Sequence, residues 1–178
     1  MKKILLGLLT VVIAGGLVYA ASDSFTITLT PTGDRGVIIA TMTVGLGNMA
    51  PSAVSTTGAI PCISTGTLAN IEYQISASVG GGAVLTSTTT PAPTSTQIEL
   101  QALFNAAVGT FAAKDVVMTV SQQVGDGAPG AFEGADDDMD AMALNAARNL
   151  WCKVTMPSTI DYTGTQTITV TVDAIAGE

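Results

Sequence analysis

In the C-terminal third of the chain, four carboxylates lie within five residues, those of Asp136, Asp137, Asp138 and Asp140. Crowded carboxylates repel one another, and a hard cation bound through oxygen atoms relieves that repulsion. Asp136, Asp138 and Asp140 match the first three ligand positions of an EF-hand loop, but Ala141 holds the glycine position and Ala147 the position of the bidentate glutamate. The pattern therefore predicts a looser Ca²⁺ site of the extracellular type at these three aspartates. The alternative is a solvated acidic loop that begins a helix.

The two cysteines, Cys62 and Cys152, are the second set of reactive groups. An even number of cysteines in an exported chain favours a disulfide, and the local alternation places each on the more apolar side of its predicted strand. Such a crosslink closes a ~90-residue loop and stabilises by roughly 4–5 kcal/mol in the loop-entropy model. The alternative is a pair of reduced, buried thiols. A catalytic thiol is disfavoured, because the chain has no histidine to activate it and Lys153 is expected on the opposite face of its strand.

Composition excludes several classes of function. The chain has 178 residues, with 6 Lys+Arg against 14 Asp+Glu, a formal net charge of −8 and no histidine. Phosphate repulsion argues against a nucleic-acid partner, and the lack of histidine excludes imidazole-based triads and zincin motifs. The sequence holds no nucleophile elbow, no phosphate-binding glycine loop and no Ser-x-x-Lys pair. We therefore predict no catalytic residue and no enzyme activity.

The first twenty residues have the layout of a secretory signal peptide. Lys2 and Lys3 precede an uncharged apolar run over 4–17, and small residues lead to a cut after Ala20. The alternative, a retained membrane anchor, is disfavoured because the apolar run is shorter than the ~20 residues of a spanning helix. The mature chain, 21–178, has a net charge of 4 − 14 = −10. We expect a secreted protein, extracellular or on the cell surface with the periplasm as an alternative, and no membrane contact after cleavage.

Alternation of apolar and hydroxyl residues dominates the mature chain. Residues 24–30, 68–79 and 167–172 each place apolar side chains on one face and polar side chains on the other, which predicts half-buried strands. Turn signals separate these runs, so the spacing suggests an all-β sandwich in a single domain. Further strands are expected at 36–46, 58–64, 115–123 and 149–155, the segment 97–104 fits a strand or a helix, and 137–147 is the one helix candidate.

The threonine-rich stretch 86–96 fits an O-glycosylated or flexible loop, or an ordinary exposed loop of a secreted β-protein. The alternation around Cys152 also puts Trp151 on the side of its strand away from the core. A tryptophan there either caps the edge of the sandwich or contacts a partner.

The segments 102–105, 148–154 and 166–172 resemble those of small exported bacterial proteins of the immunoglobulin-like β-sandwich type. The stretch Val44 to Ser78 is also similar to immunoglobulin-like surface modules and pilus-type coat subunits. The resemblance implies export and an immunoglobulin-like antiparallel β-sandwich of about 7–9 strands with one short helix. It carries over no catalytic residue.

These features together favour a structural or assembly protein of the cell surface, a subunit of a surface layer, coat or filament. Its partners are then other copies of itself or other surface proteins. The strand that carries Phe25, Ile27 and Leu29 becomes a free end after cleavage, and such a strand can complete the sheet of a neighbour by strand addition. The alternative is that it pairs within its own sheet. The competing function is a secreted adhesin or a module that binds a glycan or protein, with Trp151 as the exposed aromatic.

Overall fold

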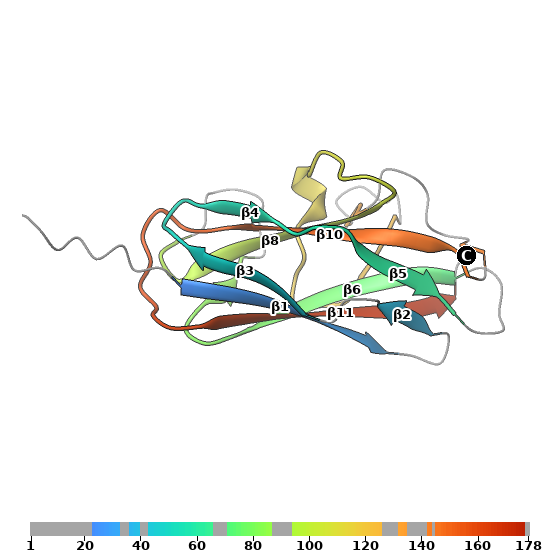
Figure 1. The fold of residues 1–178 in the computed structure, drawn as a ribbon, viewed down its shortest axis with the longest axis horizontal. Coiled ribbons are helices and arrows are strands. Elements are labelled where there is room, and N and C mark those ends of the chain that lie inside the picture. The colour runs from blue at the N-terminus through green and yellow to red at the C-terminus, as the bar shows by residue number, and fades with distance from the viewer. Residues whose placement is uncertain are drawn as a thin grey trace, which may run out of the picture.

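The computed structural model describes residues 23–32, 36–39, 43–65, 71–86, 94–125, 132–134, 142–143 and 145–176. They form strands and one 3₁₀ turn (Figure 1). The strands are β1 (Asp23–Thr32), β2 (Val37–Ile39), β3 (Thr43–Met49), β4 (Val54–Thr56), β5 (Ile60–Ser64), β6 (Ile71–Gly80), β7 (Val84–Leu85), β8 (Gln97–Asn105), β9 (Gln122–Gln123), β10 (Ala147–Thr155) and β11 (Gln166–Ala176), and the turn is η1 (Ala113–Asp115).

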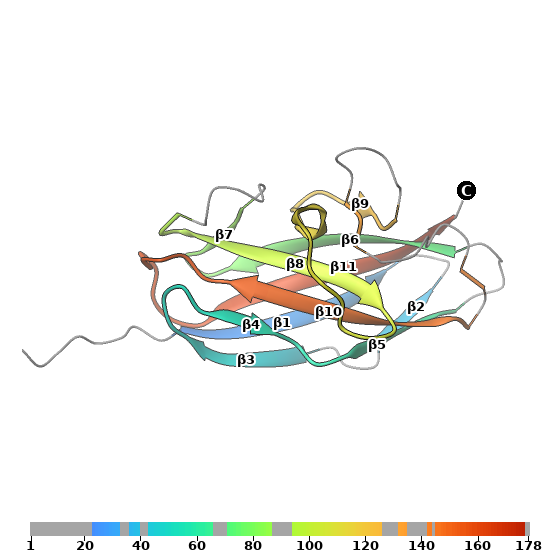
Figure 2. The same cartoon turned by 90° about the horizontal axis from the view of Figure 1, so that it is seen from above.

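Two sheets pack face to face. One has the order β3-β1-β11-β6-β9 and is called the β1 sheet here; the other has the order β2-β5-β10-β8-β7, with β4 also paired to β10, and is called the β10 sheet. Figure 2 looks through the β10 sheet onto the β1 sheet. The prediction of an all-β sandwich is confirmed.

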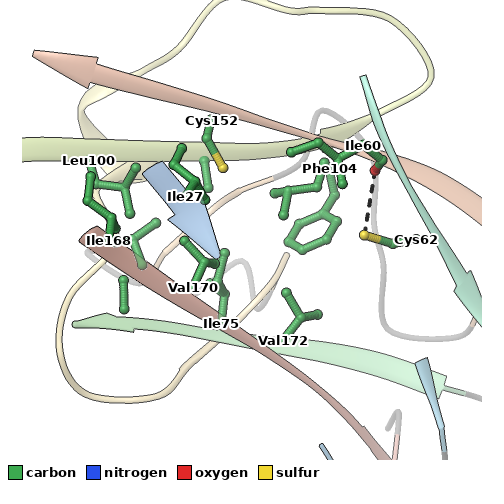
Figure 3. Close-up of a cluster of buried hydrophobic side chains, with 14 of the residues drawn as sticks. Ile27, Ile60, Cys62, Ile75, Leu100, Phe104, Cys152, Ile168, Val170 and Val172 are labelled. Atoms are coloured by element: carbon green, nitrogen blue, oxygen red, sulfur yellow. Dashed lines mark hydrogen bonds between the residues drawn. The ribbon is translucent and has the colours of Figure 1, made fainter. Parts of the chain in front are cut away.

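The core lies between the sheets because the alternation of the strands points one set of side chains inward. On β11, Ile168, Val170 and Val172 are fully buried, while the threonines between them are half-buried on the outer face. On β10, Leu150 and Val154 are buried in the same way. Figure 3 shows Ile168, Val170 and Val172 of β11 together with Leu100 and Phe104 of the other sheet between the layers. Burial of each such side chain contributes about 1.5–3 kcal/mol.

The first strand lies in the interior of the β1 sheet rather than at its edge. It pairs antiparallel with β3 and parallel with β11, in a register that runs from Phe25 opposite Gln166 to Thr32 opposite Asp173. The short pair β7–β8 is also parallel. The predicted antiparallel pairing therefore does not hold for these two pairs, and the sheets of the sandwich are mixed. Strands β1 and β11 are not joined by a hairpin, so no tight turn forces them to run in opposite directions.

The predicted strand 115–123 instead connects the two sheets along one side of the sandwich. The Val117 N–H donates to the Leu100 carbonyl of β8 (2.9 Å), and the Ala77 N–H of β6 donates to the Met118 carbonyl (2.9 Å). Only the last two residues pair as a regular strand, β9, because the segment crosses from one layer to the other.

The predicted helix over 137–147 is wrong wherever that segment is described. Met142 pairs with Ile71 as an isolated bridge, Asn145 has a φ of 61°, and Ala147 begins β10. A left-handed residue interrupts a helix, and the bridge supplies the backbone partners that a helix would otherwise provide. The ambiguous segment 97–104 is strand, within β8. In the described ranges no helix has the length and apolar character needed to cross a membrane.

Candidate functional site

Strand β1 carries the residues predicted to bind a partner. Ile27 is fully buried, and its Cα partners are Val44 on β3 and Ile168 on β11. The backbones of Phe25 and Leu29 lie in the same ladder. The strand therefore pairs within its own sheet, which is the alternative that the sequence left open.

The position of β1 makes it the link between β3 and the rest of its sheet. In the described part of the chain, β3 pairs with no strand other than β1. The β1–β3 ladder shifts register between Phe25 and Thr26, opposite Gly47, which has a φ of 70°. Glycine takes this left-handed conformation without strain, so Gly47 accommodates the irregularity in the ladder. A slot that accepts one extended strand thus lies between β3 and β11, and β1 fills it.

Trp151 lies on the outer face of the β10 sheet, as the alternation predicted. It is half-buried, and its Nε1–H donates to the carbonyl of Asn105 (3.3 Å). Its partner across the ladder, Leu103, is only 1% exposed although it too points away from the core. The indole therefore packs within the chain's own surface, with its polar group already engaged.

The segment 106–115 packs on this outer face, where Figures 1 and 2 place η1 over β8 and β10. The Gln101 Nε2 donates to the Ala112 carbonyl (2.6 Å), and the Lys153 ammonium lies 5.0 Å from the centroid of the Phe111 ring. The latter is a cation–π contact. Sequence reasoning did not predict that this segment covers the sheet, because nothing in its alanine-rich sequence indicates where it packs.

Asp115 anchors the end of this segment. Its carboxylate is 2% exposed and accepts hydrogen bonds from the N–H groups of Ala112 (2.5 Å) and Gly134 (3.1 Å). The neighbouring Lys114–Glu133 pair (3.4 Å) is about half exposed and contributes little. Asp115 thus serves the loop's structure.

Glu99 is the acid on the outer face of the β10 sheet whose pKa departs from its usual value. Burial raises that pKa, and the positive charge of Lys153 partly opposes the increase. The face therefore holds a carboxylate that the fold makes somewhat harder to ionise.

The two cysteines are free and buried, so the predicted disulfide is wrong. Both lie in the β10 sheet, Cys62 on β5 and Cys152 on β10, rather than across the core from each other. Cys62 is opposite Arg148, and the four residues from there to Cys152 span ~13 Å of strand, beyond the ~7 Å between Cα atoms that a disulfide tolerates. The alternation predicted the buried face of each strand correctly for both thiols, but the predicted bond between them does not form.

Burial also removes the reactivity of these thiols. It raises the pKa of Cys62 to about 12, despite a hydrogen bond with the Leu150 backbone that lowers it. Burial, and secondarily the charge that Cys62 carries when ionised, raises the pKa of Cys152 to about 12. Both sulfurs carry their protons at neutral pH, and a protonated thiol is a poor nucleophile and a poor metal ligand.

The predicted Ca²⁺ ligands Asp136, Asp138 and Asp140 lie outside the described residues, as do the predicted signal peptide over 1–20 and most of the threonine-rich stretch, 87–93. Among the residues that are described, no group of three acidic or cysteine side chains is placed to hold a metal ion. The calcium site stays a prediction. In comparisons with known proteins, no family model matches this sequence and no curated protein matches it.

Proposed function

We propose that this protein is an exported structural subunit of the cell surface that assembles with copies of itself. In the assembly, strand β1 of one copy fills the slot between β3 and β11 of the next. The observation that carries the proposal is the position of β1, which is the first strand of the chain and yet an interior strand of its sheet.

A strand from a second copy fits that slot because it has the same sequence. The backbone ladder with β3 and β11 and the burial of Ile27 can form between copies as they form within one. Exchange of an identical element is a low-cost route to association, since the contacts between copies are the same as those within one copy. The strand offered and the slot that receives it are different surfaces, so the contact is head-to-tail, which builds a ring where the rotation between copies closes and an open filament where it does not.

Export frees the strand that is to be exchanged. Cleavage after Ala20 leaves β1, which starts at Asp23, next to the new N-terminus. The acidic character of the chain keeps separate copies soluble, whereas strand addition relies on backbone hydrogen bonds and apolar burial rather than on charge.

The proposal includes no catalytic step. Its support is the state of the candidate nucleophiles: both thiols are buried and protonated at neutral pH. The competing function, an adhesin or glycan-binding module, has weaker support, because the Nε1–H of Trp151 is already used by the Asn105 carbonyl.

Electron microscopy of the mature chain, 21–178, tests the proposal. We expect filaments or sheets, and we expect a synthetic peptide of residues 21–32, added in excess, to stop their growth by occupying the slot. A peptide with Ile27→Asp is the matched control and should have no effect. Dispersed particles under all conditions, with and without Ca²⁺, would contradict a role in assembly.

A further inference from the structure

The outer face of the β1 sheet carries a regular array of hydroxyl groups that the proposed assembly does not use. One row crosses four strands in register: Thr43 of β3 lies opposite Thr28 of β1, Thr28 opposite Thr169 of β11, and Thr169 opposite Ser78 of β6. Strands in a sheet lie about 4.8 Å apart, so the row repeats at that spacing.

Two further rows flank the first. Thr26 lies opposite Thr167, with Gly45 and Gly80 at the ends of the row, and Thr171 lies opposite Ser76. Side chains on one face of a strand recur every two residues, about 6.7 Å. The result is a two-dimensional lattice of eight hydroxyls, which are those of Thr26, Thr28, Thr43, Ser76, Ser78, Thr167, Thr169 and Thr171.

The lattice is held rigidly. Threonine is β-branched and stiff at χ1, so its methyl and hydroxyl groups lose little freedom when a partner binds. The inward neighbours of these threonines, Ile27, Ile168 and Val170, are fully buried and fix the direction in which the outer face points.

The lattice is also accessible. Thr43 and Ser78 are exposed, and the threonines of β1 and β11 in the array are half-buried, as expected for side chains that shield one another on an open sheet. The segment with η1 packs on the other sheet, and no described element crosses these rows (Figures 1 and 2).

The chemistry of the face selects its partner. No charged group and no aromatic ring lies in the three rows, although the chain as a whole is strongly acidic. Asp173 lies one row beyond Thr171 on the same face of β11, at the border of the lattice. Within the three rows a charged ligand finds no counter-charge, and a sugar finds no ring on which to stack. A neutral, repeating lattice of hydrogen-bonding groups fits instead. We propose that this face binds the ordered water lattice at the surface of ice.

The twist of the sheet determines which residues contribute most to ice binding. Neighbouring strands rotate by about 20–25° relative to one another, so a planar surface is matched best across one pair of strands. That pair is β1 and β11, which makes Thr28 and Thr169 the centre of the site. Thr43 and Ser78 lie one strand further out on either side and should matter less.

The test is inhibition of ice recrystallisation by the mature chain, 21–178, with serum albumin as the reference for non-specific effects. We expect inhibition by the natural chain, and we expect Thr28→Lys and Thr169→Lys each to raise the effective concentration about tenfold, equivalent to about 1.4 kcal/mol. The matched control is Thr155→Lys, on the outer face of a central strand of the other sheet, which should retain full activity. Thermal melts verify that each variant is folded.

Three results would overturn the proposal: inhibition no stronger than that of albumin, equal activity of Thr169→Lys and Thr155→Lys, or binding of the natural chain to insoluble cellulose that Thr169→Lys abolishes while ice growth is unaffected. The last would assign the same face to a polysaccharide. None of these results bears on whether the chain assembles, because assembly is read separately by electron microscopy.

Discussion

Replacing Ile27 by alanine tests whether β1 belongs to the core of the folded monomer. Ile27 is fully buried, and its ladder partners are Val44 and Ile168. Truncation of a buried isoleucine to alanine costs 2–5 kcal/mol, through lost transfer free energy and the cavity that remains, and we expect about 3 kcal/mol. For a domain of this size that loss lowers the melting temperature by about 6–12 °C.

Urea unfolding in dilute solution, where copies do not associate, measures this loss. Trp151 is the only tryptophan of the chain and gives the fluorescence signal. Thr28→Ala is the matched control, one residue along the same strand but on the outer face, and it should cost less than about 1 kcal/mol. If Ile27→Ala were as mild as Thr28→Ala, β1 would not be an interior strand of the monomer and the reasoning about the slot would be refuted.

Three further predictions concern charge and metal. Burial raises the pKa of Cys62 and of Cys152 from 9.0 to about 12, so stability should be intact below pH 9 and decline above it by about 1.4 kcal/mol per pH unit for each thiol. Burial also raises the pKa of Tyr73 above its ordinary value of 10.0, so the two thiols alone set the slope only between pH 9 and 10. Unfolding titrations in that interval should show the slope halved in Cys152→Ala, and an unchanged slope would contradict the reasoning. Burial raises the pKa of Glu99 above 4.5, so Glu99→Gln should be the more stable form at pH 7, and its advantage should fade as the pH falls toward 4.5 and be absent below it; an equal difference at all pH values would contradict this. Millimolar Ca²⁺ should raise the melting temperature of the natural chain but not that of Asp138→Asn, and an identical response of both would contradict the predicted calcium site.

The sequence predicted the strands that alternate strictly, because the period of two is a local property. Strands β1, β6 and β11 fall where the alternation of apolar and hydroxyl residues placed them. The parallel pairing of β1 with β11 was not predictable in this way. Alternation fixes which face of a strand is buried but contains no information on which strand lies beside it.

The cysteines illustrate the same limit. The local pattern placed Cys62 and Cys152 on the buried side of their strands correctly, yet the pairing failed because both strands belong to one sheet. In the segment before β10, the local sequence preference itself is overridden by pairing with a distant strand. Its alanines and methionines favour a helix, but the pairing of Met142 with Ile71 takes precedence over that local propensity.

The most direct test of the proposed assembly is a crosslink between two different copies. Thr26 and Thr167 are Cα partners across the β1–β11 ladder, at a separation that a disulfide tolerates. Thr26→Cys is introduced in one preparation and Thr167→Cys in another, and the two are mixed, assembled and oxidised; the native thiols are buried and do not compete. Strand exchange predicts covalent dimers that contain one chain of each kind. If the mixture gives no such dimers, while a single chain with both substitutions closes its own crosslink, β1 stays in its own subunit and the account of assembly is contradicted.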